Sequence, residues 1–84
     1  MGSTVLIVED DPNTAKLVAL YLNRDGHNVM TAANGVDGLR LAREARPDLL
    51  VLDLMLPRLS GIEITRALRD DGSDVPIIML TARV

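Results

Sequence analysis

Short apolar runs and longer amphipathic stretches alternate along this chain. Four runs have the length and pattern of β-strands; three of them are mainly apolar and the second is half polar. They lie at residues 5–8, 28–32, 48–53 and 76–80. Between them, apolar residues recur at helical spacing at residues 12–25, 36–45 and 61–70. The pattern predicts the order β-α-β-α-β-α-β with short connections.

Residues that start helices stand where this pattern needs them. Asp11 is a good N-cap and Pro12 suits the first helical position, so we expect Asp11 to be a cap rather than a metal ligand. Asn34 can cap the second helix. Ser60 and Glu63 have the spacing of a capping box, which predicts the start of the third helix.

Strands that alternate with helices form parallel sheets with right-handed crossovers and helices on both faces. The half-polar run at residues 28–32 fits an edge strand. The first helix is unusual, because residues 12–25 are apolar around most of the helix circumference. A helix that covers one sheet face needs only an apolar stripe, so we expect this helix to pack against a second helix or to find a partner.

Composition limits the class of protein. Eighty-four residues fit one domain, and 48% hydrophobic residues with one Tyr and no Phe or Trp predict an aliphatic core. The absence of cysteine excludes disulfides and thiolate metal sites. We expect a cytoplasmic protein, because residues 1–3 lead straight into a strand without a signal peptide and no apolar run is long enough to span a membrane.

The charge pattern argues against direct nucleic-acid binding by this segment. The net charge is −3, from nine Lys and Arg residues against twelve Asp and Glu residues. Binding a phosphate backbone requires a clustered basic face, whereas the arginines here are interspersed with acids. We therefore expect the charged residues to lie mostly on solvated helix faces.

Acidic residues follow two of the predicted strands. Glu9 and Asp10 come directly after the first strand, Asp53 ends the third, and Thr81 stands just past the fourth. In a parallel open sheet, ligands bind beyond the carboxyl ends of the strands, near a switch in strand order. Converging carboxylates take up protons or bind a cation, and oxygen ligands suit Mg²⁺. Thr81 is placed to hydrogen-bond an anionic group formed on one carboxylate.

These segments carry a resemblance to a known family. Residues 8–11 (VEDD), 52–61 (LDLMLPRLSG) and 79–83 (MLTAR) resemble the receiver domain of two-component response regulators. The match covers nearly the whole chain, with the motifs in the family's order and spacing. It is most similar to regulators whose output is a winged-helix DNA-binding domain. The resemblance implies a flavodoxin-like parallel sheet and a signalling domain rather than an enzyme.

The resemblance also implies roles for individual residues. Asp53 would accept a phosphoryl group from a phosphohistidine on a sensor histidine kinase. Glu9 and Asp10 match the positions that hold Mg²⁺, together with the Asp53 side chain and the Met55 backbone carbonyl. In the third motif, Thr81 matches the switch hydroxyl that moves toward the phosphoryl group, and Ala82 matches the small residue that leaves room for it.

The sequence departs from the family pattern after the fourth strand. Receivers continue with a fourth helix, a fifth strand and a fifth helix, and a lysine at the end of the fifth strand pairs with the phosphoryl oxygens. The one lysine here, Lys16, lies in the first helix. We therefore expect residues 1–84 to be a partial, C-terminally truncated receiver domain with impaired phosphorylation. The fifth helix would be the expected cover for residues 12–25.

Two other function classes compete with this interpretation. A non-phosphorylated interaction module would self-associate through the edge of strand 76–80 and the apolar face of helix 12–25. An enzyme is less favoured, because a haloacid-dehalogenase-type phosphatase requires a second Asp two residues after Asp53, where Met55 stands. A nucleotide-binding domain requires a glycine-rich first turn, where this chain has acids at residues 9–11.

Overall fold

The computed structural model describes residues 2–80, which form four strands and three helices in the predicted order. The elements are β1 (Thr4–Val8), α1 (Pro12–Arg24), β2 (Asn28–Ala32), α2 (Gly35–Ala45), β3 (Leu49–Asp53), α3 (Gly61–Asp70) and β4 (Ile77–Leu80). Each boundary lies within one residue of the predicted one. None of the helices in this part of the chain is long and apolar enough to cross a membrane.

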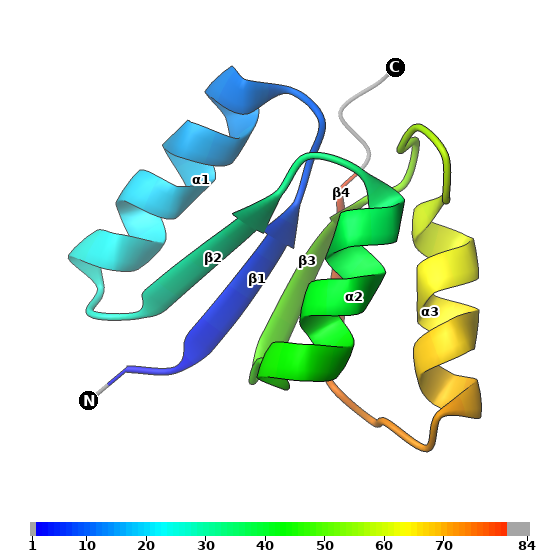
Figure 1. Cartoon of the computed structure of the whole chain (residues 1–84). Helices are drawn as coiled ribbons and strands as arrows, with labels where there is room; N and C mark the ends of the chain where they lie inside the picture. The colour runs from blue at the N-terminus through cyan, green and yellow to red at the C-terminus, as the bar shows by residue number, and fades with distance from the viewer. Residues whose placement is uncertain (1, 81–84) are drawn as a thin grey trace.

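The strands form one parallel sheet in the order β2-β1-β3-β4. This order confirms the expected flavodoxin-like arrangement. Figure 1 shows α1 on one side of the sheet and α2 with α3 on the other. The half-polar strand β2 is an edge strand, as predicted, and within residues 2–80 β4 is the opposite edge.

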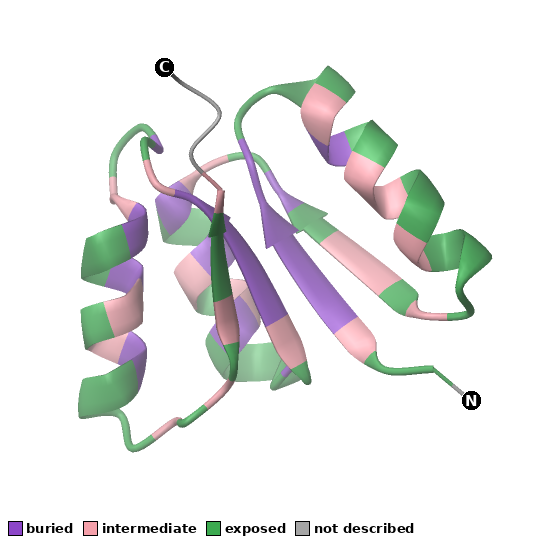
Figure 2. Cartoon of the chain, turned by 180° about the vertical axis from the view of Figure 1, so that it is seen from behind, coloured by how far each residue is buried: buried purple, intermediate pink, exposed green. Residues whose placement is uncertain are grey.

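The core has two layers because β1 and β3 are buried on both faces (Figure 2). The larger layer lies under α2 and α3 and contains aliphatic residues of both strands and both helices. Its buried members are Leu6, Val8, Ala32, Ala42, Leu50, Leu52, Leu56, Ile64 and Leu68. The smaller layer lies under α1 and has Val5, Ile7 and Val51 as its buried members. The expected aliphatic core is confirmed in both layers.

The outer side of α1 confirms the predicted wide apolar face. Leu17, Leu20 and Tyr21 are 55%, 53% and 57% exposed, although Ala15 on the same helix is buried. On β4, Ile78 is 50% exposed. The α1 side of the sheet is therefore less completely covered than the side of α2 and α3 within the described residues.

The helix starts use the caps that the sequence predicts. The Asp11 carboxylate accepts a hydrogen bond from the backbone N–H of Asn13 at 3.1 Å. The Asn34 side chain likewise accepts from the backbone N–H of Asp37 at 2.9 Å. Ser60 and Glu63 form both bonds of the capping box, at 3.1 and 3.2 Å. These bonds satisfy backbone donors that the first helical turn leaves open.

Candidate functional site

The candidate site lies where the chain changes direction across the sheet. From β1 the chain passes to β2 on one side, and it then returns past β1 to β3 on the other. This switch leaves a crevice at the carboxyl ends of β1 and β3, the usual ligand position in open α/β sheets. Glu9 and Asp10 directly follow β1, and Asp53 is the last residue of β3. The sheet therefore brings all three acids to one point.

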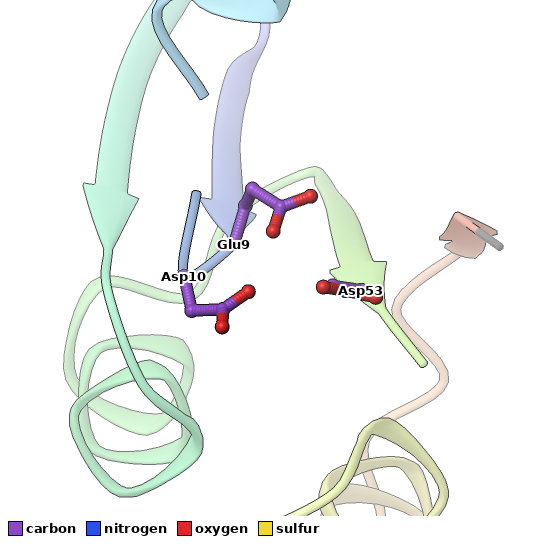
Figure 3. A group of neighbouring side chains, drawn as sticks. All are labelled: Glu9, Asp10 and Asp53. Atoms are coloured by element: carbon purple, nitrogen blue, oxygen red, sulfur yellow. The ribbon is translucent and has the colours of Figure 1, made fainter. Parts of the chain in front are cut away.

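The three carboxylates converge as predicted (Figure 3). One oxygen from each of Glu9, Asp10 and Asp53 lies within 4.8 Å of the others. Glu9 and Asp53 are each only 4% exposed, whereas Asp10 is exposed. The site therefore has two buried acids at its floor and one at its open rim.

Backbone N–H groups hold the two buried carboxylates in place. Glu9 Oε2 accepts from the N–H of Asp11, and Asp53 Oδ1 accepts from the N–H of Met55, both at 3.1 Å. The loops themselves continue the sheet. The N–H of Glu9 donates to the carbonyl of Ala32 at 3.0 Å, and the N–H of Leu54 donates to the carbonyl of Leu80 at 3.1 Å. Both acids thus stand on backbone that the neighbouring strands fix.

Burial raises the pKa of the Glu9 carboxyl to about 7. The Asp11 N–H partly counteracts this effect because it favours the charged form, while the nearby Asp53 and Asp10 carboxyls raise the pKa further. Burial and the neighbouring acids both disfavour the charged form, so the surroundings stabilise the negative charge of the cluster only in part. A bound cation would stabilise this charge further.

The donor set of the cluster fits a hard divalent cation. Within residues 2–80 the salt bridges are Arg40–Glu44 and Arg43–Asp71, so no described basic residue forms one with the three acids. Mg²⁺ contacts oxygen at about 2.1 Å, so opposite ligands on one ion lie about 4.2 Å apart. The observed spacing of up to 4.8 Å requires only a small contraction.

The other residues singled out from the sequence differ in what the structure shows of them. The backbone of Met55 lies beside Asp53 through their hydrogen bond, while the Met55 side chain is 61% exposed. Thr81 and Ala82 lie outside the described residues. Sequence reasoning did not single out Gly61, although a Cβ on it would meet the Asp53 carbonyl oxygen at 2.9 Å. A single sequence carries no signal for such a contact, because the spacing pattern is the same for any small residue.

Comparison with known proteins decides the family. The profile of the response regulator receiver domain matches residues 5–84. The chain belongs to this family. This match confirms the resemblance that the three motifs carry. Receiver domains are signalling modules of two-component systems.

One curated relative is the transcriptional regulatory protein AfsQ1 of Streptomyces coelicolor. This receiver domain is 51% identical to it over 80 residues, which are 95% of this chain and 35% of AfsQ1. The DNA-binding response regulator MtrA of Mycolicibacterium smegmatis is 45% identical over 83 residues, which are 99% of this chain and 36% of MtrA. The chain therefore spans about a third of the length of the curated relatives it matches.

Solved receiver domains share the fold closely. The receiver domain of a sensor histidine kinase from Pseudomonas aeruginosa was solved with a magnesium ion coordinated in the active-site cleft. It is 36% identical to this receiver domain, with a TM-score of 0.91, over 99% of this chain and 70% of that chain. The magnesium ion is a property of that protein.

Proposed function

We propose that Asp53 is the phosphoacceptor of this receiver domain and that the phosphoryl donor is a phosphohistidine on a sensor histidine kinase. The observation that carries this proposal is the buried Asp53 carboxylate, which converges with Glu9 and Asp10 at the end of β3. The family profile and the regulator relatives support the choice of donor. We further propose that residues 1–84 belong to a single domain and that the protein is located in the cytoplasm.

The proposed reaction is an in-line phosphoryl transfer. Asp53 Oδ1 accepts a hydrogen bond from the Met55 N–H, which orients the carboxylate. Oδ2 is the carboxylate oxygen that this bond does not use. A carboxylate oxygen attacks the phosphorus, the phosphorus–nitrogen bond breaks, and its electron pair returns to the imidazole of the donor histidine, which then takes a proton. The product is an acyl phosphate on Asp53, and such transfers are accelerated by positioning together with electrostatic stabilisation.

We propose that Glu9, Asp10, Asp53 and the backbone carbonyl of Met55 hold Mg²⁺. This ion supplies positive charge that offsets the phosphoryl oxygens and the carboxylates. Glu9 and Asp53 contribute from buried positions fixed by backbone N–H groups, and Asp10 contributes from the rim. The raised pKa of Glu9 is in line with this assignment, because burial and the nearby Asp53 and Asp10 carboxyls disfavour the charged form that a cation would favour.

The remaining parts of the proposal rest on the resemblance. Thr81 is proposed as the switch hydroxyl and Ala82 as the small residue beside the phosphoryl group. We propose that this segment makes no direct contact with nucleic acid, in line with its net charge of −3. We also infer slow phosphorylation of the 84-residue chain by itself, because a phosphoryl group adds charge beside three acids that no described basic residue pairs with.

A mass measurement tests the phosphoacceptor. The chain is incubated with Mg²⁺ and a small acyl phosphate donor, and its intact mass is recorded over time. We expect one phosphoryl adduct that is absent in Asp53→Asn and retained in Asp74→Asn, which alters an exposed loop acid instead. An adduct of equal yield in Asp53→Asn would show that another residue is modified and would overturn the assignment.

We propose self-association as a second candidate function. The Pro76 carbonyl accepts from the N–H of Leu50 in β3, and the Leu80 carbonyl accepts from the N–H of Leu54 just after β3. By the two-residue period of a strand, the backbone of Ile77 and Met79 therefore faces outward. Such an edge is a template for pairing with a second copy of the chain. The half-exposed Ile78 and the exposed apolar residues of α1 add area that a second copy would bury.

Light scattering after gel filtration tests this second candidate. We expect a dimer or larger species at micromolar concentration, and a shift toward monomer in Ile78→Lys, because an edge lysine opposes strand pairing. The control variant Arg66→Lys conserves the positive charge of an exposed residue on α3, which covers the other side of the sheet. It should leave the oligomer unchanged. A clean monomer of the unmodified chain contradicts the candidate.

A further inference from the structure

The loop between β3 and α3, residues 54–60, helps to position the site residues. It contains Met55, whose N–H holds the Asp53 carboxylate. The next residue, Leu56, is 9% exposed and belongs to the larger core layer, so it anchors the loop to the sheet. A shift of the backbone between Asp53 and Leu56 would therefore move the carboxylate and the Met55 carbonyl together.

The second half of this loop has strained backbone. Arg58 has φ +75°, and the N–H of Leu59 donates to the carbonyl of Pro57 at 2.8 Å across it. A bond from residue i to i+2 around a positive-φ residue describes a tight three-residue turn that is rare and strained outside glycine. Such a turn persists only where its surroundings hold it in place.

Two glycines hold the loop, Gly61 against its beginning and Gly35 against its end. Gly61 lies so close to Asp53 that an added Cβ would meet its carbonyl oxygen at 2.9 Å and the Leu54 Cα at 3.4 Å. Gly35, at the start of α2, lies against Leu59, whose carbonyl carbon and Cβ would each be 2.7 Å from a Cβ on Gly35. The Leu59 carbonyl oxygen would be closer still.

Neither glycine is required by its own backbone conformation. Within the described residues the glycines with positive φ are Gly26 and Gly72, so Gly35 and Gly61 adopt angles that any residue can adopt. Both are the first residues of helices, where alanine would be the better helix former. The reason for glycine at these two positions is therefore the space that the neighbouring loop occupies.

We propose that Gly35 and Gly61 are positioning residues that clamp the loop 54–60 and so set the Asp53 carboxylate and the Met55 carbonyl for the cation. The inference deepens the proposed function and rests on it for the identity of the ligand. The clamp links the start of α2, at Gly35, to the phosphoacceptor strand β3 that ends at Asp53. Gly61 fixes the beginning of the loop and Gly35 fixes its end.

Alanine substitutions test the clamp. The probes are Mg²⁺ titration by calorimetry and the amide NMR resonances of residues 54–60 in the metal-free protein. We expect the added methyl group in Gly61→Ala and Gly35→Ala to displace the loop, to move these resonances and to weaken Mg²⁺ binding by about tenfold or more, as mutations around metal ligands typically do. Thermal unfolding by circular dichroism checks that each variant folds. If Gly35→Ala does not fold, Gly61→Ala carries the test, because its added Cβ makes the milder contacts.

Gly72→Ala is the matched control. Gly72 has φ +86° and no atom within 4 Å of an added Cβ, so alanine there strains the backbone without touching the loop. We expect a lower unfolding midpoint with unchanged Mg²⁺ affinity and unchanged loop resonances. A folded Gly61→Ala variant with wild-type resonances for residues 54–60 overturns the clamp. If the unmodified chain binds no Mg²⁺ while the variants still move these resonances, the clamp stands and the proposed function fails.

Discussion

The acids at the two ends of the parallel sheet lie in opposite environments. At the amino end of the strands, the exposed Asp48 accepts the Thr4 N–H at 2.8 Å, and Asp71 pairs with Arg43 at 2.7 Å. At the carboxyl end, Glu9 and Asp53 are buried and converge with a third acid, and no described basic residue forms a salt bridge with them.

This contrast separates structural acids from functional ones. The acids at the amino end remain in contact with water, and the chain itself supplies their partners. The acids at the carboxyl end lose hydration and repel one another, so they cost stability until a cation binds. A cost of this kind is typical of sites built for a ligand, and the raised pKa of Glu9 is its direct sign.

The largest expected effect is a pH dependence of metal-free stability. The pKa of Glu9 is about 7 in the folded chain, against about 4.3 for an unfolded Glu. Folding thus favours the protonated form, so the contribution of Glu9 is fully present below about pH 4.3 and is lost as the pH rises through about 7. We expect the free energy of unfolding, measured in urea without metal, to fall by about 2 kcal/mol between about pH 5.5 and 8.

Glu9→Gln tests the origin of this dependence. Glutamine keeps the size and lacks the titrating charge, so the fall in unfolding free energy between these pH values should largely disappear. Added Mg²⁺ should stabilise the unmodified chain more at the higher pH, because it binds the ionised carboxylates. A variant that keeps the full pH dependence would place the titrating group elsewhere and would remove the contrast between the two ends.

Much of the fold could be predicted because its signals are local. The dipeptide Asp11-Pro12 and the Ser60 capping box mark helix starts within a few residues, and apolar runs mark the buried strands. The general rule for ligand position in parallel sheets then places Glu9 and Asp53 together. These inferences require only neighbouring residues and a rule of connectivity.

Other features of the site depend on tertiary packing and left no local signal. Glu9 and Asp10 are adjacent acids, yet one is buried and the other exposed, because only Glu9 continues the β1 backbone pairing with Ala32. The strained turn at Arg58 is equally silent in sequence, since arginine has no preference for positive φ. Its conformation follows from Leu56 in the core and Gly35 beside Leu59.

A smaller effect is expected from relaxing the strained backbone at the carboxyl end. Arg58→Gly removes the steric cost of φ +75° but adds freedom to the unfolded chain, so we expect a net gain of at most about 1 kcal/mol in urea unfolding. Arg66→Gly, in the interior of α3, should instead lose about 1 kcal/mol. Equal losses in both variants would show that Arg58 is not strained.

The amino end of the strands should give the smallest effect. Arg43 and Asp71 join the ends of α2 and α3, and the Asp71 carboxylate raises the pKa of the Arg43 guanidinium through their hydrogen bond. Both side chains remain at least 40% exposed, so water and salt screen their attraction. We expect Arg43→Gln to leave the urea midpoint nearly unchanged, and the small remaining difference to vanish in high salt. A salt-resistant loss of stability as large as the pH effect of Glu9 would mean that this ion pair stabilises the fold strongly. The acids at the two ends of the sheet would then no longer differ in kind.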